Sequence, residues 1–331
     1  MRIGLLGAGR IGQIHGRSAA SHKDATLAAI TDVDAKAVAA LADETGASAA
    51  KSTADIINDK TIDAVLICTP TDTHADLIEQ AAKAGKAVFC EKPVDLSADR
   101  VRACLKVVAD TKAPLMIGFN RRFDPSFASL QKRLAAGEIG KAEIVTILSR
   151  DPAPPPVSYI ARSGGLFRDM MIHDLDMARF LLGEEPVEVS ALASCLVDPE
   201  IGKAGDIDTA VVTLKTASGK LAQISNSRRA TYGYDQRIEV HGSGGMLRAQ
   251  NMFPTTVERA DAKGFATDPV MHFFLERYLP AYRAEMDAFV TGVKSGKAMN
   301  PTGDDGLKAL LLADAALESM KSGKAVRVAA S

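Results

Sequence analysis

The glycine-rich stretch after the first apolar run constrains the fold more than any other feature of this sequence. Residues 3–6 are apolar and predict a short strand, residues 7–12 read GAGRIG, and a helical pattern follows from residue 11 to about residue 20. A GxGxxG string is common by chance, so the elements before and after it decide whether it marks a dinucleotide-binding turn. Here a second apolar run over residues 25–31 ends at Asp32, about 20 positions after the glycines. Strand, glycine turn, helix and carboxylate together predict a Rossmann-type dinucleotide-binding unit.

The residue types in this turn fit a dinucleotide. Gly7 permits the tight turn, Gly9 lets the backbone approach a pyrophosphate, and Gly12 allows the helix to pack closely on the strand. The helix N-terminus then faces the anion. Asp32 can accept hydrogen bonds from the adenosine ribose, and together with Asp34 it would repel a 2′-phosphate, so we expect NAD rather than NADP. A solvated acidic turn at a strand end is the alternative for Asp32.

Strands and helices continue to alternate through the first third of the chain. Apolar runs predict strands over residues 62–68, 87–90 and 114–118, with helices over residues 74–84 and 98–109. This order is typical of a doubly wound parallel sheet, in which ligands bind beyond the carboxyl ends of the strands. The loops at residues 68–71 and 90–93 leave strands at that edge. The predicted cofactor-binding residues are Gly7, Ala8, Gly9, Arg10, Ile11, Gly12, Asp32, Thr69, Pro70, Glu91 and Lys92.

From about residue 121 the alternation stops. Strand patterns over residues 143–150, 187–195, 207–216, 220–225, 237–241 and 246–248 follow one another with few helices between them, and Ser218-Gly219 is a hairpin signal. We therefore predict an α+β domain with a mostly antiparallel open sheet, followed by helices over residues 271–291 and 306–321. A chain of 331 residues is also longer than one hydrophobic core usually supports, which favours two domains. The expected boundaries are 1–120 and 121–331.

Composition and charge exclude several classes of protein. Forty basic and 41 acidic residues give a net charge of -1, which provides no field to attract nucleic acid or a membrane surface. The N-terminal apolar stretch is too short for a membrane span, so a cytoplasmic location is expected. The four cysteines and six histidines show no metal-ligand spacing, so we expect reduced structural thiols and no metal. The expected partners are small molecules and further copies of this chain.

Four motifs in order resemble the Gfo/Idh/MocA family of oxidoreductases. They are the glycine turn, Thr69-Pro70, the tripeptide Glu91-Lys92-Pro93, and a DxxxH string from Asp169 to His173. The resemblance covers essentially the whole chain. Within the family, the GFNRRFD string at 118–124 and the stretch at 273–289 look most like the inositol 2-dehydrogenases. This implies an NAD-dependent oxidation of a ring hydroxyl in a polyol or sugar, with Lys92 in contact with the substrate.

Three residues have the chemistry that alcohol oxidation needs. The reaction requires a base for the hydroxyl proton and support for the developing alkoxide. Lys92, just past a strand, could hydrogen-bond the reacting oxygen. Asp169 and His173 are four residues apart on a segment with helical periodicity, so we expect both on one face, with the aspartate holding the imidazole of the general base. The alternatives are a surface lysine, a helix cap and a satisfied core histidine.

Other polar residues are weaker candidates for binding the substrate. Asn120 and Arg121 fall at the expected domain junction, where their side chains could reach the nicotinamide or a substrate hydroxyl. Packing at the hinge explains them nearly as well. Asp151 ends a strand and could bind a polyol hydroxyl or cap a turn. Tyr234 could present its hydroxyl to the pocket, although an aromatic core role is favoured for it and for the other tyrosines of the second half.

The second half also suggests self-association. In the predicted strand at 207–216, apolar residues fall on both alternating faces, so one helical layer would leave apolar surface uncovered. We expect a homo-oligomer through this sheet, and the family resemblance suggests a tetramer. A non-catalytic sensor of the same fold is the competing function, expected to lack the lysine or the Asp/His pair. Among substrates myo-inositol leads, followed by scyllo-inositol and by aldoses or anhydrosugars.

Overall fold

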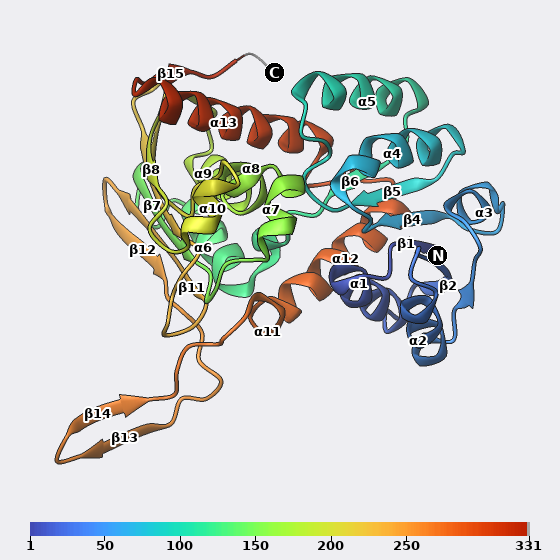
Figure 1. The fold of residues 1–331 in the computed structure, drawn as a ribbon, viewed down its shortest axis with the longest axis horizontal. Helices are drawn as coiled ribbons and strands as arrows, with labels where there is room; N and C mark the ends of the chain where they lie inside the picture. The colour runs from blue at the N-terminus through green and yellow to red at the C-terminus, as the bar shows by residue number, and fades with distance from the viewer. Residues whose placement is uncertain (330–331) are drawn as a thin grey trace. The chain divides into compact units, whose positions relative to one another are not determined.

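The computed structural model describes residues 1–329, apart from the side chain of Ala161. The chain forms two compact units, each assembled from separate stretches (Figure 1). Among the described residues, the first unit consists of 1–123 and 280–310, and the second of 124–279 and 311–329. A stretch from the C-terminal part of the chain therefore belongs to the N-terminal unit.

The first unit is built on a six-stranded parallel sheet in the order β3-β2-β1-β4-β5-β6. The order reverses between β1 and β4, which is the point where doubly wound sheets bind their ligands. The strands are β1 (Arg2–Leu6), β2 (Thr26–Thr31), β3 (Ser48–Ala49), β4 (Ala64–Ile67), β5 (Ala87–Cys90) and β6 (Leu115–Ile117). The helices are α1 (Arg10–Ala20), α2 (Ala35–Thr45), α3 (Thr53–Asn58), α4 (His74–Lys83), α5 (Ala98–Thr111), and the 3-10 turns η1 (Thr71–Thr73) and η2 (Asn120–Phe123).

The central strands of this unit are almost continuously apolar because helices cover both faces of the sheet. Every residue of β4 and β5 is buried. Helix α12 (Leu279–Ser295) contributes Met286, Phe289 and Val290 to the same core, and Phe289 meets Phe89 of β5 with ring centroids 5.8 Å apart. Helix α12, which lies far from the first 120 residues in the sequence, thus forms part of the core of their unit.

The second unit contains a seven-stranded sheet in the order β12-β11-β7-β10-β9-β8-β15. All neighbours are antiparallel except β7 and β10, which run parallel. The strands are β7 (Ala142–Arg150), β8 (Pro186–Ser194), β9 (Thr209–Thr216), β10 (Leu221–Ser227), β11 (Asp235–Gly242), β12 (Gly245–Ala249) and β15 (Val326–Arg327). The predicted fold class, a Rossmann sheet followed by an α+β domain with a mostly antiparallel sheet, is confirmed.

Helices of the second unit gather on one side of its sheet, where α9 lies against β7 and β10 (Figure 1). They are α6 (Pro125–Ala135), α7 (Val157–Ser163), α8 (Gly165–Asp169), α9 (Ile172–Leu182), α10 (Pro199–Lys203), α11 (Phe274–Arg277) and the distal part of α13 (Gly303–Ser322). A separate hairpin of β13 (Glu258–Asp261) and β14 (Gly264–Thr267) projects from the unit and is exposed throughout.

Two predicted helices are each divided in the structure. The helix expected over residues 271–291 splits into α11 and α12, because Pro280 cannot donate a hydrogen bond and is tolerated only in the first turn of a new helix. The segment carrying Asp169 and His173 is also divided. Helix α8 ends at Asp169, α9 begins at Ile172, and the backbone amides of Met170 and Met171 both donate to the carbonyl of Leu166.

None of the helices within residues 1–329 is long and apolar enough to cross a lipid bilayer.

Candidate active site

The glycine turn between β1 and α1 has the geometry of an anion-binding loop. Gly7 has a φ of +97°, and a Cβ there would lie 2.6 Å from the Cys68 carbonyl group. A Cβ at Gly12 would lie 2.0 Å from the Gly7 carbonyl oxygen, so the helix start is pressed against the turn. Gly9 is exposed, and a Cβ there would meet nothing within 4 Å. No side chain caps α1, which leaves its first amides for an anion.

Asp32 has a structural role that the sequence did not predict. Its carboxylate accepts hydrogen bonds from the backbone amide of Ala8, at 2.6 Å, and from that of Asp34, at 2.9 Å. It therefore braces the glycine turn from the end of β2, at the edge where a ribose would lie. Asp34 caps α2 by accepting from the amides of Lys36 and Ala37. Both carboxyl groups lie beside the turn, which suits a ribose with free hydroxyls better than a phosphorylated one.

The loops after β4 and β5 carry the other predicted residues of this unit. Thr69 is partly buried, Pro70 is exposed, and the Thr69 hydroxyl lies 2.6 Å from that of Thr73. Glu91 is buried, and Lys92 beside it is partly buried. These loops leave adjacent parallel strands, so they share the carboxyl edge of the sheet with the glycine turn. Asn120, also in this unit, is 3% exposed in η2.

The remaining predicted residues gather at one edge of the second sheet. Asp151 follows β7, and its amide donates to the Ser227 carbonyl at the end of β10. Arg150 of β7 is the strand partner of Asp235 at the start of β11, so Tyr234, which precedes Asp235, lies at the same edge. Tyr234 is 6% exposed and packs edge-on against Tyr278. This favours the core role that the sequence suggested for it. Arg121, by contrast, is buried in η2 of the first unit.

Asp169 joins this edge through a buried arginine that the sequence did not indicate. Arg228, 1% exposed, lies just past β10 and places its guanidinium 3.4 Å from an Asp169 carboxylate oxygen. The Tyr159 hydroxyl donates to the other oxygen at 3.1 Å. Arg168, the preceding residue, pairs with Asp314 of α13, which anchors α8. Arg228 is 59 positions from Asp169, so only the tertiary fold could reveal this pair.

His173 lies in the first turn of α9 and is partly exposed. The next residue, Asp174, is fully buried and accepts a hydrogen bond of 2.9 Å from Asn226 of β10. This bond fixes the start of α9, and with it the backbone of His173, at the carboxyl end of β10. That Asp169 orients the His173 imidazole stays a prediction.

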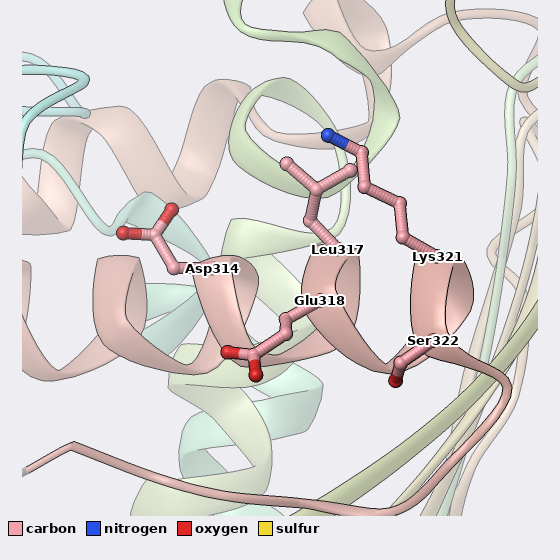
Figure 2. A pocket seen from close by; sticks show the side chains of 5 residues that line it. All are labelled: Asp314, Leu317, Glu318, Lys321 and Ser322. Atoms are coloured by element: carbon pink, nitrogen blue, oxygen red, sulfur yellow. The ribbon is translucent and has the colours of Figure 1, made fainter.

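An open pocket in the second unit contains none of the predicted site residues. Figure 2 shows it on α13, lined by Asp314, Leu317, Glu318, Lys321 and Ser322. All of its lining residues come from one helix, and none is a predicted site residue.

The four cysteines are free thiols, as predicted. Burial raises the pKa of Cys68 and Cys90 well above the ordinary value, and it raises that of Cys104 to about 12. These thiols therefore stay protonated and unreactive, which supports a structural role.

A dinucleotide turn on a Rossmann sheet, followed by an α+β unit that carries an aspartate and a histidine at one sheet edge, is typical of a class of two-domain oxidoreductases. Residues 1–119 match the oxidoreductase family with an NAD-binding Rossmann fold, and residues 127–248 match the GFO/IDH/MocA C-terminal domain. The chain belongs to the GFO/IDH/MocA family of NAD-dependent oxidoreductases. The predicted family and cofactor are thereby confirmed.

Several of the similar proteins are inositol dehydrogenases by name. The chain is 57% identical to the inositol 2-dehydrogenase of Rhizobium meliloti over 99% of both chains. It resembles the crystal structure of a myo-inositol dehydrogenase from Corynebacterium glutamicum with a TM-score of 0.96, at 46% identity over 100% of this chain and 99% of that one. It also resembles a scyllo-inositol dehydrogenase from Lactobacillus casei with bound NAD(H) and scyllo-inositol, with a TM-score of 0.93, at 32% identity over 100% and 99% of the chains.

Proposed function

We propose that this protein oxidises the 2-hydroxyl of myo-inositol to the ketone, 2-keto-myo-inositol, with NAD as the hydride acceptor. The observation that carries the proposal is the 57% identity to an inositol 2-dehydrogenase over the full length. The uncapped α1 and the open surface at Gly9 support NAD binding, and the cluster of Asp151, Asp169 and His173 at one sheet edge supports polyol binding.

NAD, when bound, supplies the acceptor for the hydride that leaves the substrate carbon. The chain supplies the proton chemistry. We propose His173 as the general base that removes the hydroxyl proton, Asp169 as the carboxylate that stabilises the resulting imidazolium, and Lys92 as a hydrogen-bond donor to the reacting oxygen. The Asp169 carboxylate also faces Arg228 and Tyr159, which hold it in place.

Asp151 is the strongest candidate for binding a second substrate hydroxyl, because it is partly exposed at the sheet edge that carries Asp169. Asn120 and Tyr234 are buried, so they would contact substrate only through polar atoms that line a pocket.

Scyllo-inositol is the second candidate substrate, favoured by the likeness to the Lactobacillus casei enzyme. A non-catalytic sensor is disfavoured, because Lys92, Asp169 and His173 are all present. A cytoplasmic location stays a prediction of the sequence.

The test is NADH formation by the purified protein against myo-inositol, scyllo-inositol, other inositol epimers and aldoses, with NAD and NADP compared. We expect the highest kcat/KM with myo-inositol and NAD. A higher kcat/KM with scyllo-inositol would move the assignment to that epimer. Absence of turnover with every polyol, in protein that still binds NADH, would contradict the proposal and support the sensor.

We further propose that the protein is a homotetramer assembled through the open face of the seven-stranded sheet. On this face Leu192 is 77% exposed, and Val211 lies directly opposite it on β9. Leu221 of β10 pairs with Ile144 of β7, and both are at least 40% exposed. Apolar pairs on neighbouring strands form a patch of the kind that subunit interfaces cover.

Light scattering at micromolar concentration should therefore report a tetramer. Leu192→Asp places a charge in the patch and should shift the population to smaller species, whereas Lys106→Glu, at an exposed position of α5 in the first unit, should not. A monomeric wild-type protein would contradict the assembly, and a tetrameric Leu192→Asp variant would place the interface elsewhere.

A further inference from the structure

Two buried histidines hold the loop that carries Lys92, and the function proposed above does not use either of them. The loop is the turn Glu91-Lys92-Pro93 after β5. His15 contacts its first residue, and His74 contacts its last. Both histidines belong to the first unit, on different helices.

His15 holds Glu91 from α1. It is fully buried, and its Nε2 lies 2.7 Å from a carboxylate oxygen of Glu91. The imidazole is wedged between aromatic rings, with centroids 4.8 Å from Phe89 and 5.4 Å from Tyr282. The second carboxylate oxygen of Glu91 accepts a hydrogen bond of 3.3 Å from the backbone amide of Lys92. His15 therefore acts on Lys92 through one carboxylate.

Close packing confines that carboxylate further. A Cβ built at Gly118, after β6, would lie only 3.1 Å from the Glu91 carboxyl carbon. The Glu91 side chain thus has the His15 ring on one side and backbone on the other. Without the His15 donor, it would be a buried carboxylate with reduced hydrogen bonding, which disfavours its present position.

His74 holds the other end of the turn. It is 2% exposed at the first position of α4. Its Nδ1 lies 2.7 Å from the Pro93 carbonyl oxygen, and its Nε2 lies 2.7 Å from the Thr69 carbonyl oxygen. Carbonyl oxygens only accept hydrogen bonds, and a neutral imidazole has a single N–H. Both short contacts are satisfied only if both ring nitrogens carry hydrogen.

We propose that His15 and His74 are positioning residues for Lys92, and that His74 does this as an imidazolium that ties the Thr69 turn to the Pro93 turn. The proposal rests on Lys92 acting on the substrate. It makes the two loops at the carboxyl edge of the sheet one rigid element, because a single ring bonds the backbone of both. Lys92 lies between Glu91, which His15 contacts, and Pro93, which His74 contacts.

The charges around Glu91 are consistent with this arrangement. Glu285 of α12 is fully buried, and neither of its carboxyl oxygens has a hydrogen-bond partner among the described residues. Burial, and then the neighbouring charge of Glu91, raise the pKa of Glu285 well above its ordinary value, which favours its neutral form. The Nδ1 of His15 likewise lacks a described partner, which fits a neutral ring with its one hydrogen on Nε2. The two histidines should thus differ in protonation.

The spectroscopic test needs no substrate. In a solid-state ¹⁵N spectrum of histidine-labelled full-length protein at neutral pH, His74 should show two protonated nitrogens and His15 one protonated and one bare nitrogen. Each signal is assigned by its loss in His74→Phe or His15→Leu. A bare nitrogen on His74 would overturn the imidazolium, whether or not the protein oxidises inositol.

The kinetic test separates positioning from general packing. A displacement of 1 Å can cost about 10²-fold in rate. We therefore expect His74→Phe and His15→Leu to lower kcat about 10- to 100-fold, with KM for NAD changed less than about twofold, while His15→Gln, whose amide can donate to Glu91, recovers part of the loss. His241→Gln, at an exposed histidine, should match wild type.

Folded variants with wild-type kcat would overturn the proposal, as would a loss of NAD affinity in proportion to kcat. Failure of His15→Gln to exceed His15→Leu would also do so. If Lys92→Ala retained wild-type kcat, the assigned function of Lys92 would be wrong, and the spectrum would still decide the state of His74. Thermal unfolding of each variant shows whether it folds.

Discussion

Replacing His173 with alanine is expected to lower kcat for inositol oxidation by about 10² to 10⁴-fold, the usual contribution of a positioned general base. The binding of NAD should change little, because His173 lies in the second unit, whereas the dinucleotide turn lies in the first. Steady-state kinetics with varied inositol and varied NAD measure both effects. The stability of the fold should be retained, because the side chain is partly exposed.

His272→Ala is the matched control, because it removes an exposed imidazole from the same unit. Its kcat should equal that of wild type. Turnover of His173→Ala within about threefold of wild type would contradict the base assignment, because positioned bases contribute far more. An equal fall in NAD affinity would instead indicate a role in the cofactor site.

Replacing Gly12 with alanine is expected to abolish measurable NAD binding and to destabilise the first unit. The new Cβ would lie 2.0 Å from the Gly7 carbonyl oxygen, so the turn or the start of α1 must move. Overpacking of this kind costs about 1–3 kcal/mol of folding free energy. It also displaces the amides that would face the pyrophosphate, and each 1.4 kcal/mol lost there weakens binding about tenfold. Fluorescence titration with NADH and thermal unfolding measure the two effects.

Gly9→Ala separates the two roles of the turn. A Cβ at Gly9 meets nothing within 4 Å, so the fold should be as stable as wild type. NADH binding should still weaken, because the methyl group occupies the surface that a pyrophosphate approaches. If Gly12→Ala bound NADH normally, or if both variants lost stability equally, the packing explanation of the turn would be wrong.

The sequence pattern was enough to predict a structural element wherever one short segment contains the whole motif. The dinucleotide turn was recognisable because its strand, glycines and helix are contiguous, and the strands β4 and β5 were evident because burial on both faces makes them uniformly apolar. The strand pattern of the second half was sufficient for its mostly antiparallel sheet. The boundaries of the helices were harder to predict from the sequence than the strands. The divisions at Tyr278 and at Met170-Met171 depend on one proline and on shared backbone bonds within otherwise periodic stretches.

Contacts between distant segments could not be predicted in this way. Nothing near Asp169 in the chain points to Arg228, and nothing near Lys92 points to His15 or His74, because each pair is formed by strands and helices that pack side by side after folding. The parallel pairing of β7 with β10, and the inclusion of residues 280–310 in the first unit, belong to the same class of fact. The order of side chains along the backbone was enough for the family and the cofactor, and it supplied the candidates for the reacting groups. Only long-range packing, where burial makes every hydrogen bond count, determined which neighbours hold those groups in place.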